Sequence, residues 1–84
     1  HKQTMIEVDT RDRLGLLYNI TNTLFRNQIT IRSAVIATYG EQAVDTFYVN
    51  DLFGEKITSS EKLEQVRTEL LFYLDKHFKK ALKN

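Results

Sequence analysis

The sequence predicts an α+β fold in which an antiparallel sheet carries two helices on one face. Residues 4–9 alternate between apolar and polar side chains, residues 28–50 hold two β-prone runs around a glycine, and two further segments place apolar residues at helical spacing. The 84 residues include no proline and no cysteine. A chain of this length forms one domain and buries only about 60% of its unfolded surface, so a partner would stabilise it. The absence of cysteine excludes disulfides and thiolate zinc sites.

The N-terminal part of the chain predicts a strand followed by a helix. Residues 4–9 have the period of two that is typical of a half-buried strand. After a polar interruption, apolar residues recur at steps of three and four from Leu16 to Leu24. We therefore expect a helix from about Leu14 to Arg26, and the carboxylate of Asp12 is placed to cap its first amides.

The middle of the chain predicts a β-hairpin with an irregularity. The β-prone run 28–39 changes the parity of its apolar residues halfway along. A β-bulge near Arg32 and Ser33 would return both halves to one core face, because a one-residue slip otherwise reverses every side chain. Residues 40–42 then form the turn into a further strand, 43–50.

The C-terminal part predicts a long helix. The segment 58–61 matches a capping box, in which the Thr58 hydroxyl and the Glu61 carboxylate satisfy each other's backbone amides. Apolar residues then continue at helical spacing, so we expect the helix to reach about Lys83. Residues 76–84 hold four lysines and no acid, which makes the helix end basic and suits the helix dipole.

The resulting order, βαββα, equals the first five elements of a ferredoxin-like βαββαβ unit. The fourth strand of that unit lies beside the first, so we expect the fourth strand to be missing or supplied by a partner. The first strand would then be a sheet edge, covered by another copy, a neighbouring domain or the end of the second helix. The outward sheet face also suggests an interface. Its members would be Met5, Val35, Ala37, Tyr39, Val44, Thr46 and Tyr48.

The loop Asp12-Arg13-Leu14-Gly15-Leu16-Leu17 resembles the D-R-P-G-[LV]-L loop of the ACT domain family, which comprises small amino-acid-sensing modules of metabolic regulators. The resemblance covers about residues 4–70. Within the family, the pattern of residues 43–51 is most similar to the C-terminal ACT domains of bifunctional uridylyltransferases that modify the PII signal protein in nitrogen control. Leu14 departs from the family pattern, because the proline usual at that position presets φ at the start of the helix.

The resemblance implies an amino-acid site, with glutamine as its ligand, at a seam between two ACT domains. The implied ligand-binding residues are Asp12, Arg13, Leu14, Gly15, Leu16, Leu17, Ser33 and Ala34. Asp12 would receive the ligand's ammonium group, and the backbone of residues 15–17 would receive its carboxylate. No cofactor or metal is implied. The implied partner is another ACT domain in cis or in trans, a homodimer for this chain alone, and neither nucleic acid nor membrane.

Residues 1–84 are thus expected to form one regulatory domain of a longer cytoplasmic uridylyltransferase, with residues 1–3 as a linker or non-native leader. The chain itself is not expected to be an enzyme, since it shows no nucleophile–base pair. One alternative is a ligand-free dimerisation domain, which Leu14 favours. Another is a nucleic-acid-binding domain, but the strand that carries Phe47 and Tyr48 lacks basic residues. Asp45, which interrupts the apolar face of that strand, is interpreted as a structural carboxylate.

Overall fold

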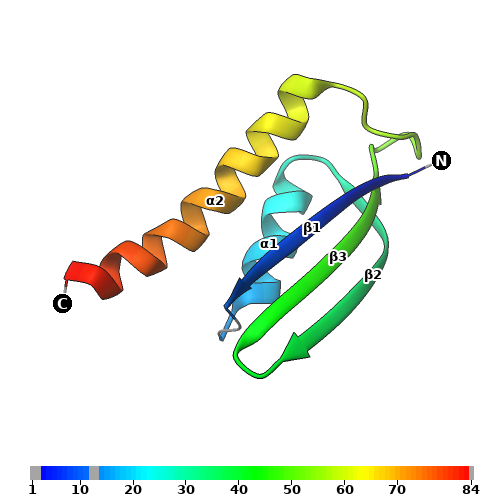
Figure 1. Ribbon diagram of the computed structural model, residues 1–84. Coiled ribbons are helices and arrows are strands. Elements are labelled where there is room, and N and C mark those ends of the chain that lie inside the picture. Colours follow the sequence, from blue (N-terminus) through cyan, green and yellow to red (C-terminus); the bar gives the residue numbers. More distant parts are fainter. Residues whose placement is uncertain (1–2, 12–13, 84) are drawn as a thin grey trace.

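The computed structural model describes residues 3–11 and 14–83, with side chains up to residue 74. Its elements confirm the predicted order βαββα (Figure 1). They are β1 (Thr4–Arg11), α1 (Leu16–Arg26), β2 (Thr30–Tyr39), β3 (Gln42–Asn50) and α2 (Ser60–Lys83). The structure is that of an α+β, ferredoxin-like fold, as the sequence predicted.

The strands of the described residues form a three-stranded antiparallel sheet in the order β1-β3-β2. β1 pairs with β3 from Thr4 opposite Val49 to Arg11 opposite Gln42. β2 and β3 form the predicted hairpin. Strand β1 therefore lies at one edge, with α2 running alongside it at a similar slant (Figure 1).

The predicted β-bulge in β2 is confirmed. Ile31 lies opposite Val49 and Ser33 lies opposite Tyr48, so Arg32 is the additional residue. Beyond the bulge, Ile36 lies opposite Asp45, on the sheet face that the helices cover. The inserted residue thus gives both halves of β2 one common inner face.

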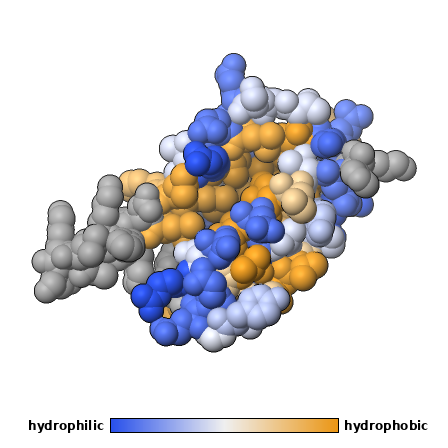
Figure 2. Space-filling view, in the orientation of Figure 1, coloured by the Kyte–Doolittle hydropathy of each residue, from blue (hydrophilic) through white to orange (hydrophobic). Residues whose placement is uncertain are grey.

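The core lies between the helices and the inner faces of β1 and β3. Its buried apolar residues are Val8, Leu16, Ile20, Leu24, Ile29, Ala43, Phe47, Val49, Ile57, Val66 and Leu70. The inner residues of β2 beyond its bulge remain exposed. Apolar side chains also reach the surface between α2 and β1 (Figure 2). The helices therefore cover the middle of the sheet more fully than its two edges.

The structure corrects the boundaries of both helices. α1 begins at Leu16 rather than near Leu14. α2 begins at Ser60, and the backbone amide of Lys62 donates to the Ser59 hydroxyl at 3.2 Å. Ser59 is thus the capping residue in place of Thr58. The predicted capping box is wrong, because the residue three positions after Ser59 is a lysine rather than Glu or Gln.

Thr4 joins the start of β1 to the loop before α2. Its hydroxyl donates to the carbonyl of Ile57 at 3.2 Å and accepts from the Ile57 amide at 2.9 Å, and both residues are buried. We expect Thr4→Val to lower the free energy of unfolding by about 1–3 kcal/mol, because both Ile57 groups lose their partner without regaining water. Equilibrium urea denaturation measures this loss.

Thr46→Val is the matched control for that substitution. Thr46 lies on the outer face of the sheet and is half-buried. We expect its replacement to change the free energy of unfolding by no more than about 0.5 kcal/mol. Equal losses in the two variants would contradict the role assigned to the Thr4 hydroxyl.

Candidate functional site

The N-terminus of α1 carries no side-chain cap among the described residues. Gly15 occupies the capping position in the left-handed conformation, with φ of 81°, and its carbonyl accepts from the amide of Asn19 at 3.0 Å. The first amides of a helix have no partner within the helix and carry the positive end of its dipole. This terminus is therefore suited to an anionic group.

A hollow of about 450 Å³ lies against this helix terminus. Its lining residues are Leu14, Gly15, Leu16, Leu17, Tyr18, Ile36, Thr38, Ala43 and Asp45. They come from the start of α1, the second half of β2 and the first half of β3. The hollow is thus mainly apolar, with the hydroxyls of Tyr18 and Thr38 and the carboxylate of Asp45 in its wall.

Asp45 supplies the carboxylate of this hollow. It lies on the inner sheet face between Val8 of β1 and Ile36 of β2, and only 1% of its surface is exposed. A carboxylate in an apolar wall requires donors, and its two oxygens offer about four acceptor positions. Asp45 can therefore accept a hydrogen bond from a bound cationic group in addition to its contacts within the protein.

A second, larger hollow of about 710 Å³ lies on the β2 side of α1. Its lining residues are Tyr18, Thr21, Asn22, Phe25, Gln28, Ile29, Thr30, Ile31 and Leu52. Tyr18 also lines the first hollow, and Tyr18 and Phe25 are 70% and 78% exposed. The two hollows together make an apolar surface along α1 and β2.

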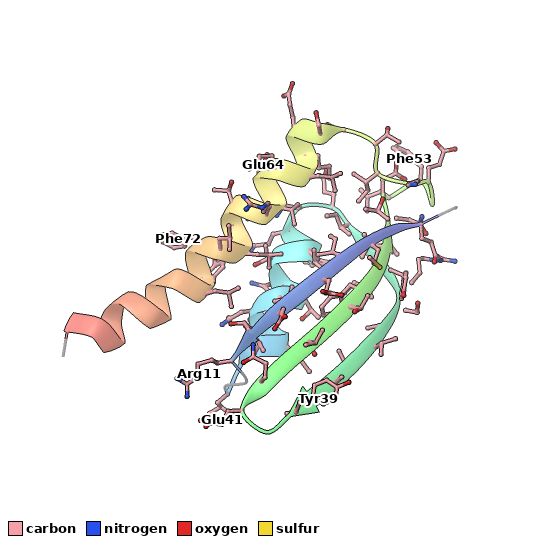
Figure 3. All side chains as sticks on the ribbon, in the orientation of Figure 1. Arg11, Tyr39, Glu41, Phe53, Glu64 and Phe72 are labelled. Carbon is pink, nitrogen blue, oxygen red and sulfur yellow. The ribbon has the colours of Figure 1, made fainter. Side chains whose placement is uncertain are left out.

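The two ends of the sheet differ in character (Figure 3). At the hairpin end, a guanidinium nitrogen of Arg11 lies 2.9 Å from a carboxylate oxygen of Glu41, in a solvent-exposed ion pair. At the other end, the loop before α2 exposes the ring of Phe53. The first hollow, which contains Thr38 and Ala43, lies toward the charged end.

Within the described residues, no cluster of three or more His, Cys, Asp or Glu side chains is arranged to bind a metal ion. The same residues include no helix that combines the length and the apolar character needed to span a membrane.

Residues 1–75 match the family model described as the ACR family N-terminal ACT domain. This chain belongs to the ACT domain family. The ACT domain is 58% identical over 67 residues to the bifunctional uridylyltransferase/uridylyl-removing enzyme of Cereibacter sphaeroides, a match that covers 80% of the chain and 7% of that enzyme. It is 54% identical over 71 residues to the enzyme of the same name from Azospirillum brasilense, covering 84% of the chain and 8% of the enzyme. The ACT domain thus spans less than a tenth of these relatives.

The structure brings only part of the predicted ligand site together. Residues 14–17 line the hollow at the start of α1. Asp12 and Arg13 lie outside the described residues. Ser33 and Ala34 are exposed on β2 and do not line this hollow, and Ser33 faces outward beside Tyr48.

Five residues of the hollow were not predicted as site residues. They are Tyr18, Ile36, Thr38, Ala43 and Asp45. The change of parity in β2 was the signal for its two members, because a bulge at Arg32 puts Ile36 and Thr38 on the same face as Asp45. The same parity that predicts the fold therefore also predicts the β2 wall of the hollow.

Proposed function

We propose that this ACT domain is a cytoplasmic regulatory module that binds a small amino acid, with glutamine as its ligand. One observation carries the proposal. The uncapped N-terminus of α1 and the carboxylate of Asp45 border the same hollow. An α-amino acid has a carboxylate and an ammonium group on one carbon, so these two features are complementary to its two charges.

The amides at the start of α1 would bind the ligand's carboxylate. Gly15 has no side chain to obstruct an approach to the backbone, and a Cβ built on it meets nothing within 4 Å. Helix N-termini bind anions through free amides and the helix dipole. The ammonium group would donate to Asp45, a charge-assisted contact that is strengthened by the apolar surroundings.

The remaining wall would select the side chain of the ligand. Leu17 and Ile36 offer apolar contact to its methylene groups, and the Thr38 hydroxyl can both donate and accept. A side-chain amide needs one donor and one acceptor, which favours glutamine over a purely apolar amino acid. The similarity to bifunctional uridylyltransferase/uridylyl-removing enzymes supports a role in the regulation of such an enzyme. The resemblance of residues 43–51 implies an enzyme that modifies PII in nitrogen control.

A second ACT domain, in cis or in trans, would close the site. Tyr18 and Ile36, which line the hollow, are exposed, and so is Phe25 further along α1. A contiguous apolar surface of this kind is typical of an interaction site. For this chain alone we expect a homodimer. Ligand bound at the seam would favour the closed arrangement by its differential affinity for the two states.

Isothermal titration of the chain with each of the twenty amino acids tests the proposal. We expect heat with glutamine. In Gly15→Ala the affinity should fall by about tenfold. A residue with a side chain disfavours φ of 81° by roughly 1–2 kcal/mol, so the backbone at position 15 should move away from the conformation that binds the ligand's carboxylate. Gly54→Ala is the matched control, since Gly54 has φ of 80° and equally open surroundings but lies outside the hollow.

The competing function is that of a ligand-free dimerisation domain, which Leu14 at the usual proline position favours. It predicts a dimer in sedimentation analysis and no heat with any of the twenty amino acids. That result would refute the proposed amino-acid binding. Equal loss of affinity in the Gly15 and Gly54 variants would refute the assignment of the carboxylate to the start of α1.

A further inference from the structure

A groove of about 440 Å³ runs between the outer edge of β1 and the apolar side of α2. It lies at the sheet edge opposite to the one that β2 forms. It appears as an apolar band between these two elements in Figure 2. Residues 4–9 form one wall. The other wall consists of Leu63, Val66, Arg67, Leu70, Leu71 and Leu74.

We propose that this groove binds an extended peptide segment of alternating apolar and basic residues, which adds to the sheet as a strand along β1. β1 has eight residues, a length of about 26 Å at 3.3 Å per residue. Within the described residues, its ladder partner is β3, on one side. The backbone groups on the other side of an edge strand are a template for a further strand.

The apolar side chains of the added strand would fill the groove. Alternate side chains of a strand point to opposite faces, so every second one would point inward toward α2. There they would contact Ile6, Leu63 and Leu74, which are partly buried, and Leu71, which is 39% exposed. Burial of the apolar area that these residues still expose would provide the hydrophobic contribution to the binding free energy.

The outer face of β1 determines the charge of the segment. Glu7 and Asp9 both point outward there, opposite Thr46 and Val44 of β3. Asp9 accepts a hydrogen bond of 2.9 Å from the side-chain amide of Gln42, a neutral group that adds no positive charge. Lysine or arginine at the outward positions of the added strand would lie beside these acids. Opposite charges on neighbouring strands are favourable.

The same charges argue against a second copy of β1 in this groove. When two β1 strands pair antiparallel, side chains directly opposite each other point to the same face of the sheet. The inner faces of both copies therefore lie on one side only when the two-fold axis of the pair passes through a residue rather than between two residues. The registers that pair most of β1 are centred on Glu7, which pairs residues 4–10, and on Val8, which pairs residues 5–11. The first opposes Glu7 to itself, and the second opposes Glu7 to Asp9. Registers centred on Ile6 or Asp9 pair only residues 4–8 or 7–11. Like charges directly opposite each other are destabilising. A segment with basic residues removes this repulsion.

An NMR titration of the isotope-labelled chain with eight-residue peptides tests the proposal. The probe alternates valine and lysine, a second peptide alternates valine and glutamate, and a third has the composition of the probe in two blocks. We expect the probe to shift β1 amide resonances and slow their exchange with solvent. The valine–glutamate peptide should bind about tenfold more weakly, since two charge pairs change sign. The block peptide should not protect β1.

Charge reversal on β1 supplies the decisive variant. In Glu7→Lys with Asp9→Lys the preference should invert, so that the valine–glutamate peptide binds more tightly. Glu55→Lys with Glu61→Lys is the matched control, because it makes the same change of charge at exposed positions outside the groove and should keep the original preference.

Three results would overturn the proposal. The first is equal binding of the block peptide and the probe. The second is a set of shifts confined to α1 and β2. The third is protection of β1 amides that rises with protein concentration without peptide, which would assign the groove to a second copy.

Discussion

Phe47→Ala is expected to lower the free energy of unfolding by about 3–5 kcal/mol, the usual cost of removing a fully buried phenyl ring. Phe47 is 1% exposed and lies in the middle of β3, between Ile6 and Ala34 of the flanking strands. A domain of 84 residues has a total stability of about 4–13 kcal/mol, so the variant loses a large part of it. Urea denaturation followed by circular dichroism measures the change.

Two further variants keep this prediction testable if Phe47→Ala does not fold. Phe53→Ala removes an equal ring that is 89% exposed, and should change the free energy of unfolding by about 0.5 kcal/mol or less. Phe47→Leu retains most of the buried volume and should lose less than Phe47→Ala. A loss in Phe53→Ala as large as that in either Phe47 variant would contradict the placement of Phe47 at the centre of the core.

Most of the fold could be predicted from local patterns. The period of two in β1 and the helical spacing in α1 and α2 follow directly from which faces are buried. Even the bulge at Arg32 was predictable, because only an inserted residue gives both halves of β2 one inner face. These patterns are carried by residues close together in the sequence.

The cap of α2 shows where local patterns become insufficient. Both Thr58 and Ser59 have a hydroxyl that can accept from a helix amide. Which of the two hydroxyls caps α2 depends on the path by which the chain enters the helix, and residues far from the cap in the sequence constrain that path. The Asp51 carboxylate accepts from the amides of Phe53 and Glu55, and Thr4 holds Ile57. Sequence spacing around residues 58–61 contains none of this information.

The candidate site was predicted in part for a similar reason. The loop pattern identified residues 14–17, which line the hollow. Which β2 residues face the start of α1 depends on how the helix packs against the sheet, and no local sequence pattern encodes this packing. The start of α1 lies against Ile36 and Thr38 rather than Ser33 and Ala34. Asp45 was recognised as an exception on an apolar face, but its place in the hollow required the structure.

Asp45→Asn is expected to weaken glutamine binding by roughly 10- to 100-fold, because a hydrogen bond to a charged group contributes about 1.5–3 kcal/mol. Asparagine keeps the shape of the side chain and removes its charge. The measurement is the dissociation constant from isothermal titration, accompanied by the urea midpoint of each variant. Asp9→Asn is the matched control, since Asp9 lies on the outer sheet face and should leave the affinity unchanged.

The direct contact between Asp45 and the ligand's ammonium group can be separated from a structural effect with an analogue. Glutaramic acid has the carboxylate and the side-chain amide of glutamine but no ammonium group. If Asp45 binds the ammonium group, the original chain and Asp45→Asn should bind this analogue with similar, weak affinity, and the variant should lose affinity for glutamine alone. If Asp45 acts only by holding the hollow in shape, Asp45→Asn should lose affinity for both compounds by the same factor, and the assignment would be wrong.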